Sequence, residues 1–130
     1  MAKSVTGGCK CGAVSYRGET LEAQPFRCYC RDCQQLTGTG HSEMFPLDRD
    51  SFRINGQISE YSMTGSSGRK TFSCFCPDCG SPIYRRSERS GDRLYVHAAS
   101  MSDPAIHAPG LEIYVDSAQP WDQPKGTAES

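Results

Sequence analysis

The chain has 130 residues, which is enough for one hydrophobic core and too few for two. Its 14 basic and 15 acidic side chains give a formal net charge of −1, so there is no electrostatic reason to expect nucleic acid or a membrane surface as a partner. Neither the first twenty residues nor any later stretch contains the apolar run of a signal peptide or a membrane span. We therefore expect a single cytoplasmic domain.

In chain order, the sequence predicts many short strands with turn signals between them. Apolar and polar residues alternate in residues 12–19 (GAVSYRGE). Residues 51–56 (SFRING) end in Asn55-Gly56, a strong hairpin signal, so residues 57–63 (QISEYSM) are the predicted partner strand. Further strands are predicted over residues 69–75, 81–87, 92–98 and 110–116. This spacing of short strands indicates a mainly-β fold.

One short helix and one polar tail complete the predicted organisation. The helix is expected to begin at Arg31 (RDCQQL) and to stop at residues 37–40 (TGTG). Beyond Trp121, which is predicted to be the apolar anchor of the last strand, the sequence DQPKGTAES is polar and suits a loose end. We predict one zinc-binding domain over residues 1–121 and a polar C-terminal tail over residues 122–130.

All eight cysteines lie in three clusters, and two of these clusters repeat the form Cys-aromatic-Cys-x-Asp-Cys. The clusters are CKC at 9–11, CYCRDC at 28–33 and CFCPDC at 74–79. Cytosolic thiols stay reduced, so clustered cysteines favour a metal over a disulfide framework. Ligand sets made only of sulfur select zinc or iron–sulfur clusters, and no ferredoxin-type run is present. The sequence therefore predicts zinc.

The residue that follows the last cysteine distinguishes two kinds of cluster. Gly12 and Gly80 follow two of them, and a glycine after the last ligand allows the positive φ with which zinc knuckles end. These two clusters are predicted to pair around one closed structural zinc. Its four predicted ligands are Cys9, Cys11, Cys76 and Cys79.

The remaining cluster, Cys28, Cys30 and Cys33, offers three thiolates and no evident fourth ligand. Three protein ligands and one open position are typical of a catalytic zinc, so these cysteines are the predicted catalytic site and the ligands of a second zinc. Cys74 leaves two alternatives open. It either closes this second site or stays a spare buried thiol, and we favour the spare thiol.

Histidines and basic residues give weaker signals. Each lone histidine is more often a satisfied polar or core residue than a ligand, and His41 is expected to lie nearest the second site. Among the basic residues, Arg31 is the best candidate to bind a carboxylate of a thiol ligand because it lies inside the second cluster. A solvated surface position is favoured for the other candidates: Arg69, Lys70, Arg85 and Arg86.

These motifs resemble the glutathione-dependent formaldehyde-activating enzyme family, which also includes centromere protein V. The resemblance covers about residues 5–121 and rests on GGCxCGAVxY from Gly7, CxCxxC from Cys28, CxxCGSP from Cys76, Asp103-Pro104 and Pro120-Trp121. It implies a β-tent fold of small antiparallel sheets pinned by two zinc ions, with the ligand sets given above. Tyr29 stands where the family commonly has His, and Cys74 is additional.

The resemblance also implies a reaction and a ligand. The family's reaction joins glutathione to formaldehyde as S-hydroxymethylglutathione, and its reverse is a carbon–sulfur lyase step. We therefore expect a zinc-dependent enzyme that acts on glutathione or a related thiol and an aldehyde. The alternative is a non-catalytic zinc module for protein interaction or for carrying the glutathione adduct.

Overall fold

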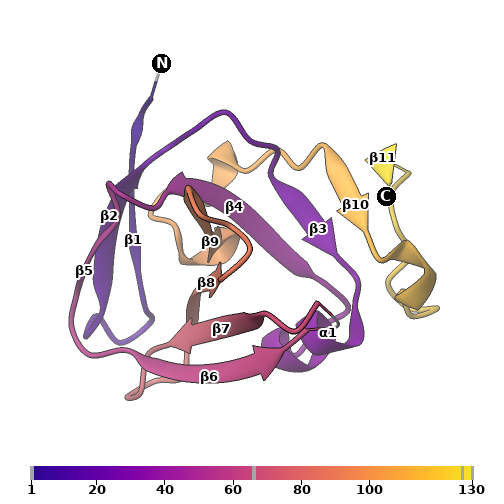
Figure 1. Cartoon of the computed structure of the whole chain (residues 1–130), viewed down its shortest axis with the longest axis horizontal. Helices are drawn as coiled ribbons and strands as arrows, with labels where there is room; N and C mark the ends of the chain where they lie inside the picture. The colour runs from indigo at the N-terminus through magenta and orange to yellow at the C-terminus, as the bar shows by residue number, and fades with distance from the viewer. Residues whose placement is uncertain (1, 66, 127, 130) are drawn as a thin grey trace.

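Two β-sheets hold most of the regular structure (Figure 1). The structure is a computed structural model that describes residues 2–65, 67–126 and 128–129. The smaller sheet has the strand order β1-β2-β5, formed by Ser4–Gly8, Ser15–Glu19 and Arg53–Asn55. The larger sheet has the order β11-β10-β3-β4-β9-β8-β7-β6. Its strands are β3 (Phe26–Cys28), β4 (Ser42–Asp48), β6 (Ser59–Thr64), β7 (Lys70–Phe75), β8 (Pro82–Ser87), β9 (Arg93–His97), β10 (Leu111–Ile113) and β11 (Ala128–Glu129).

The predicted mainly-β fold with one short helix is confirmed. Most neighbouring strands are antiparallel, but β10 runs parallel to both β3 and β11, so the larger sheet is mixed. Three 3₁₀ turns, η1 (Ala98–Ser100), η2 (Pro104–Ile106) and η3 (Val115–Ser117), lie between the later strands. Within the described residues, no helix is long and apolar enough to cross a membrane.

The helix α1 (Arg31–Thr37) begins and ends where the sequence predicts. Cys30 is its N-cap residue, and its sulfur accepts a hydrogen bond from the backbone N–H of Cys33 at 3.3 Å. Gly38 ends the helix in the left-handed conformation, with φ of 76°, and its N–H bonds back to the carbonyl of Gln34. The helix therefore starts inside the second cysteine cluster.

The predicted hairpin around Asn55-Gly56 is wrong. β5 pairs with β2, with Asn55 opposite Ser15, whereas β6 pairs with β7. Gly56 has φ of 98°, and a Cβ atom there would overlap the carbonyl oxygen of Ala13. The glycine thus lets the chain pass close to the β1–β2 region on its way from the smaller sheet to the larger one.

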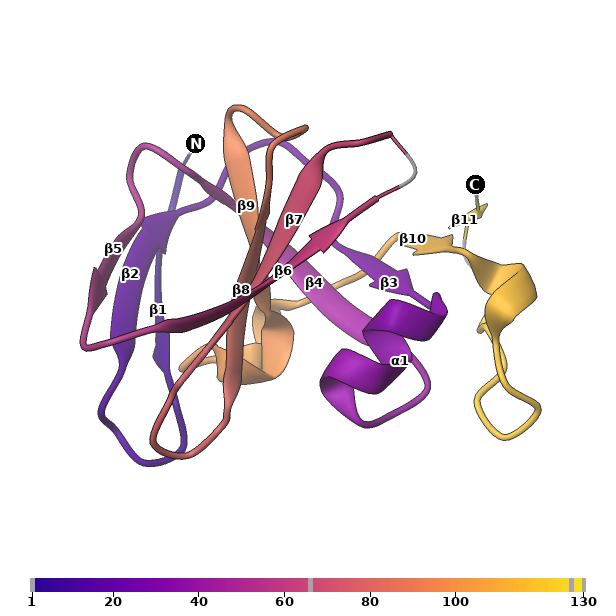
Figure 2. The same ribbon diagram turned by 60° about the horizontal axis from the view of Figure 1, so that its bottom comes forward.

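The two faces of the larger sheet have different roles. One face packs against the smaller sheet, and the core between them includes Val5, Val14, Tyr16, Phe45, Leu47, Leu94 and Val96. The opposite face carries Cys28, Ser42, His97 and Arg85, because strand pairing places Cys28 opposite Ser42 and side chains alternate along each strand. Helix α1 lies beside β3 and β4 on this side of the molecule (Figure 2). The sheet therefore separates an apolar core from a polar, helix-covered layer.

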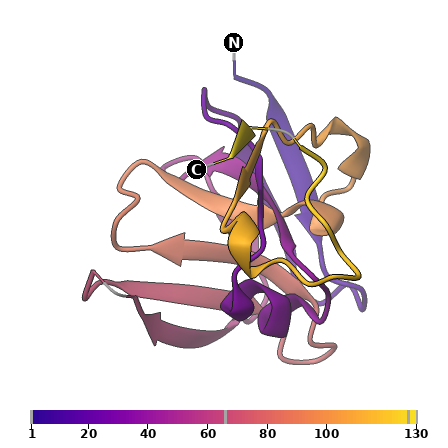
Figure 3. The ribbon, with the colours of Figure 1, turned by 90° about the vertical axis from the view of Figure 1, so that its right-hand side faces the viewer.

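The C-terminal segment differs from the sequence prediction in two respects. Trp121 is 69% exposed, so it does not anchor the last strand. The segment after it is attached to the sheet rather than loose. The backbone N–H groups of Lys125 and Gly126 donate to the buried carboxylate of Glu112 at 2.9 and 3.0 Å. Figure 3 shows this segment running beside β10.

Candidate metal centres

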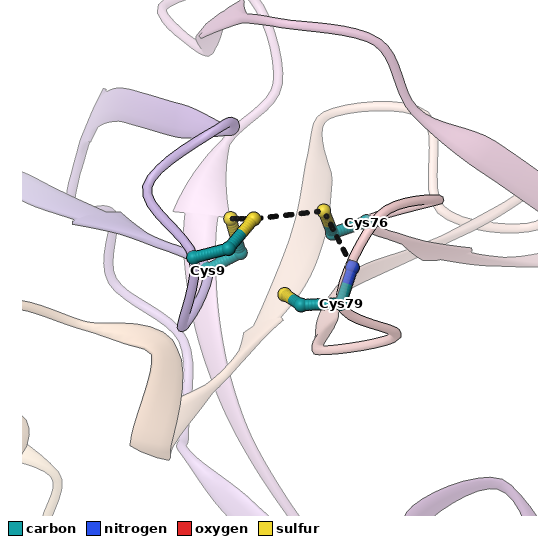
Figure 4. A group of neighbouring side chains, drawn as sticks. Cys9, Cys76 and Cys79 are labelled. Atoms are coloured by element: carbon teal, nitrogen blue, oxygen red, sulfur yellow. Dashed lines mark hydrogen bonds between the residues drawn. The ribbon is translucent and has the colours of Figure 1, made fainter.

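The first group of cysteines joins two loops that are distant in the sequence. Cys9 and Cys11 come from the β1–β2 loop, and Cys76 and Cys79 from the β7–β8 loop. The four sulfur atoms lie within 4.8 Å of one another, and the labelled side chains in Figure 4 point into a common space. Two measured sulfur–sulfur distances are 3.6 Å (Cys9–Cys11) and 3.8 Å (Cys11–Cys76). A tetrahedral zinc with sulfur ligands at about 2.3 Å requires a separation of about 3.8 Å, and a disulfide requires about 2.05 Å.

Backbone geometry at the two loops suits thiolates. The N–H groups of Val14 and Asp78 point at the sulfurs of Cys9 and Cys76, at 3.2 and 3.4 Å. Gly12 and Gly80 have φ of 85° and 78°, as predicted for the residues that follow the last ligands. These glycines allow each loop to fold back so that its N–H groups face sulfur.

Ser81 connects the two loops of the first group. Its hydroxyl accepts a hydrogen bond from the backbone N–H of Lys10 at 3.1 Å and lies 3.1 Å from the sulfur of Cys79. This contact lowers the pKa of the Cys79 thiol to about 5. No local pattern indicates this role of Ser81, because it depends on tertiary contact between the loops.

The second group lies where β3 meets α1. Cys28, Cys30 and Cys33 place their sulfurs within 4.8 Å of one another, with Cys28 and Cys33 buried and Cys30 partly buried. Because the three thiols lie close together, they shift one another's pKa. Hydrogen bonds from Cys28 and Cys30 hold the pKa of Cys33 far below its ordinary value, and contacts with Cys30 and Cys33 raise that of Cys28. A divalent cation would remove the repulsion that prevents all three from ionising together.

Arg85 is the side chain at the second group that sequence reasoning missed. It was predicted to be at the surface, but its Nη1 donates to the sulfur of Cys33 at 3.1 Å. Its positive charge favours the thiolate of Cys33. The strand pattern could have indicated an inward position only if the pairing of β8 with β9, which places Arg85 opposite Tyr95, had been known.

Cys74 lies apart from both groups. It is fully buried in the core between the sheets, and its sulfur contacts the carboxylate of Glu60 at 3.6 Å. Burial raises the pKa of this thiol to about 11, so it stays protonated at neutral pH. Among the described residues, neither cysteine group includes it. The favoured alternative, a spare buried thiol, agrees with this position.

The histidines are polar-bonded or core residues, as favoured for each of them, rather than ligands of a cysteine group. His41 does not join the second cysteine group, because its two ring nitrogens contact Asp122 at 2.5 Å and Glu43 at 2.8 Å. Its ring lies 4.9 Å from that of Tyr29, which stands between Cys28 and Cys30. His97 is buried, and burial together with the charge of Arg85 lowers its pKa to about 4, against the opposing charge of Cys33.

Glu43 is the centre of a hydrogen-bond network beside the second group. Its carboxylate accepts from Arg27 at 2.7 Å and from His107 at 2.9 Å, in addition to its contact with His41. Burial opposes ionisation, yet hydrogen bonds from His107, Arg27 and His41 lower the pKa of Glu43 to about 2. The network holds β3 against β4 next to Cys28.

A second carboxylate fixes the cysteine loop itself. Glu112 is fully buried and accepts a hydrogen bond from the hydroxyl of Tyr29 at 2.8 Å. The amide of Gln34 holds the same loop from the helix side, by donating to the carbonyl of Tyr29 at 2.8 Å. Tyr29 therefore binds a partner on a neighbouring strand rather than facing a ligand.

Arg31, the predicted ligand-binding arginine, lies at the start of α1. It is exposed, and its Nη1 donates to the side chain of Gln34 at 2.6 Å. Its binding of a ligand carboxylate stays a prediction.

A cleft of about 760 Å³ opens beside the first cysteine group and extends toward the end of α1, although none of Cys28, Cys30 and Cys33 lines it. Cys9 and Lys10 line it from the first group, and Thr37, His41 and His97 line it from the side of the second. Thr37 contacts the backbone of the second group, because its hydroxyl donates to the carbonyl of Cys33 at 2.7 Å. The volume falls in the range of ordinary small-molecule sites, roughly 300–1,000 Å³.

Comparisons with known proteins assign the chain to a family. The sequence model of the glutathione-dependent formaldehyde-activating enzyme family matches residues 4–117. A crystal structure of a Rhodobacter sphaeroides protein is similar in fold, with a TM-score of 0.60 and 24% identity over 75% of this chain and 87% of that one. None of the curated proteins compared with the chain matches it. Since the family match spans most of its length, the chain belongs to the glutathione-dependent formaldehyde-activating enzyme family.

Proposed function

We propose that this protein is a zinc-dependent carbon–sulfur enzyme that joins glutathione or a related thiol to an aldehyde, in the manner of S-hydroxymethylglutathione formation. The single observation that carries the proposal is the three-cysteine group. Its sulfurs are gathered within 4.8 Å, and Cys74, the cysteine that belongs to neither group, lies elsewhere among the described residues. Three sulfur ligands suit a zinc that has a fourth position for a ligand.

In this proposal, Cys28, Cys30 and Cys33 hold the second zinc, and Cys9, Cys11, Cys76 and Cys79 hold the structural one. When bound, zinc would lower the pKa of a thiol that enters its open position. A thiolate is the nucleophile that adds to an aldehyde carbonyl.

The protein's own side chains balance the charge of the second group. Three thiolates and Zn²⁺ sum to −1, and the guanidinium of Arg85 on Cys33 brings the total to 0. A fourth thiolate can therefore enter without building up a large uncompensated charge in a buried site. Four thiolates around the first zinc would already sum to −2, with no such cation bonded to sulfur among the described residues.

The cleft supplies room for the remainder of a thiol such as glutathione. Lys10 lies on one side and His41 and Glu43 on the other, so the lining offers both charge signs to a ligand with ammonium and carboxylate groups. Arg31 is the further candidate for a ligand carboxylate, at the start of α1.

The test compares bond formation with and without the protein. Glutathione and formaldehyde combine unaided, so exchange NMR should measure the rate of adduct formation in the presence of wild type and of Cys30→Ser. We expect wild type to accelerate exchange and Cys30→Ser to lose the acceleration while retaining the first zinc. Equal rates with wild type and with no protein would contradict the proposal and favour a non-catalytic zinc module.

A further inference from the structure

Buried hydrogen-bond donors without partners surround the second cysteine group. Nε and Nη2 of Arg85 and Nε2 of His97 are inaccessible to solvent and have no hydrogen-bond partner within the described part of the chain. His97 as a whole is only 6% exposed. Leaving one such group unsatisfied costs about 1–3 kcal/mol, and more if it is charged. The two guanidinium nitrogens are donors, and Nε2 of His97 is a third in the tautomer that carries the proton there. Together they indicate that an acceptor atom from outside the chain completes the site.

Strand register brings these donors together on the face that α1 covers. Arg85 pairs with Tyr95 on β9, and His97 is two residues further along β9, so the two side chains lie diagonally on the same face. Ser42, whose buried hydroxyl helps to lower the pKa of Cys33, is diagonal to His97 on the next strand and lies opposite Cys28. The row therefore crosses from β8 to β3 and ends at the cysteines.

The guanidinium of Arg85 is fixed relative to sulfur. Its Nη1 bonds to Cys33 at 3.1 Å, and the group is planar and rigid. Its other two nitrogens are therefore within about 5–6 Å of that sulfur. This is the separation at which one side chain can contact sulfur through one nitrogen and a ligand atom through another.

We propose that Arg85 and His97 bind the oxygen atom of a ligand whose sulfur occupies the three-cysteine group, so that the site selects molecules with sulfur and oxygen on one carbon. The inference rests on the proposed function and deepens it, since a thiol–aldehyde adduct has this arrangement. Glutathione alone does not use this oxygen position, because the carbon beside its sulfur carries no oxygen.

The reaction gives these donors a defined task. The thiolate sulfur forms a bond to the carbonyl carbon, and the π electron pair of the C=O bond moves to oxygen. That oxygen takes up the proton that the thiol released on ionising, so thiol plus aldehyde equals hemithioacetal with no other reactant. Arg85 stabilises the negative charge on oxygen before the proton arrives, as donors in an oxyanion hole do.

His97 complements Arg85 as an uncharged group. Burial, and then the charge of Arg85, lower the pKa of His97 to about 4, so its imidazole is neutral at neutral pH. It can share a hydrogen bond with the ligand oxygen without adding a second positive charge beside the guanidinium.

A pair of small thiols tests the oxygen site through the change that each variant makes in their relative affinity. Thioacetate carries sulfur and oxygen on one carbon, and propane-2-thiol has a methyl group in place of that oxygen. Thioacetate is also much the stronger acid, but this difference belongs to the ligands and is the same for every variant. Calorimetric titration of the zinc-loaded protein should show that Arg85→Gln and His97→Phe lower the wild-type preference for thioacetate by about ten- to hundredfold, the range for a hydrogen bond to a charged group.

Arg86→Gln is the matched control, because Arg86 is the next residue on β8 and has other partners. It contacts Glu60 at 2.9 Å and lies 3.9 Å from the ring centre of Phe72. This variant should keep the wild-type preference. Arg85→Lys should keep the charge but lose part of the preference, because lysine cannot contact sulfur and oxygen with one rigid group.

Zinc content, measured by chelator release in denaturant, accompanies each titration. A wild-type preference that is unchanged in a zinc-replete Arg85→Gln protein would overturn the inference. If Arg85→Gln loses the second zinc, an unchanged preference in zinc-replete His97→Phe would overturn it instead. Failure of the proposed function looks different, since wild type would then leave glutathione–formaldehyde exchange unaccelerated while the variants still lower the preference for thioacetate.

Discussion

The four-cysteine and three-cysteine groups use one residue type in opposite surroundings. The first lies at the tips of two loops, with Cys11 and Cys79 exposed, and its sulfurs contact backbone N–H groups and one serine hydroxyl. The second lies between a sheet and a helix, beside an arginine and a buried histidine. The first surroundings offer four sulfurs to a metal ion, whereas the second offer three and leave buried nitrogens without hydrogen-bond partners among the described residues.

The comparison shows that cysteine spacing alone does not define a site. Cys30-x-x-Cys33 and Cys76-x-x-Cys79 have the same spacing, yet one begins a helix and the other forms a knuckle. Gly80 permits the knuckle by adopting φ of 78°, and in the other copy Gln34 continues the helix. The residue that follows the motif decides which backbone it adopts.

The largest expected effect comes from breaking the first group. Cys79→Ser should leave little folded protein, because structural zinc contributes about 10–16 kcal/mol and a whole domain is stable by only about 5–15 kcal/mol. Circular dichroism and a zinc assay on the purified variant measure this loss. A cooperatively folded Cys79→Ser protein would show that the first group does not hold the sheets together.

Breaking the second group should have a more local effect. Cys30→Ser is expected to fold, to keep one zinc and to lose the other, because the sheets around it remain joined by the first group and the core. The zinc assay and a thermal melt, side by side with Cys79→Ser, provide the measurement. Equal unfolding of the two variants would remove the distinction between the groups.

The network beside the second group should make stability depend on pH. The pKa of Glu43 is lowered to about 2, so its stabilising contribution is complete above about pH 4.5 and disappears as pH falls toward 2. At neutral pH, Glu43→Gln should therefore cost on the order of 2 kcal/mol, and the difference from wild type should shrink through this window. Urea unfolding at several pH values, with zinc content followed, measures it. A difference independent of pH would mean that the charge of Glu43 is not what matters.

The smallest expected effect belongs to the cysteine outside both groups. Cys74→Ser should keep both zinc ions and lose at most about 1–3 kcal/mol, because a hydroxyl costs more to bury in this core than a thiol does and the nearby carboxylate of Glu60 offsets only part of that cost. The zinc assay and the midpoint of urea unfolding test this pair of outcomes. Loss of a zinc ion would mean that Cys74 is a ligand after all.

Local features of the sequence predicted much of this structure. The helix at Arg31 and its end at Gly38 follow from capping and backbone rules, and the grouping of cysteines follows from their spacing and the glycines after them. The central strand β4 was missed because its residues Met44 to Leu47 are all buried and include Pro46, so it lacks the alternation of a half-exposed strand.

Long-range pairing accounts for the parts that could not be predicted. The positions of β5 and β6 depend on which sheet each joins, and Asn55-Gly56 is compatible with either a hairpin or a crossing. Arg85 and His97 become neighbours of Cys33 only through the pairing of β8, β9 and β4. No local pattern contains that information.

The separation of the cysteines along the chain has a consequence for the order of folding. Cys28, Cys30 and Cys33 lie within six residues, so we expect the unfolded chain to capture a zinc ion there before any sheet forms. Cys11 and Cys76 are 65 positions apart, and that loop must close first. A metal that also binds the denatured chain stabilises the native state less. If the two groups bind zinc with equal affinity in the folded protein, the zinc at Cys9, Cys11, Cys76 and Cys79 should therefore add more to the free energy of unfolding than the zinc at Cys28, Cys30 and Cys33.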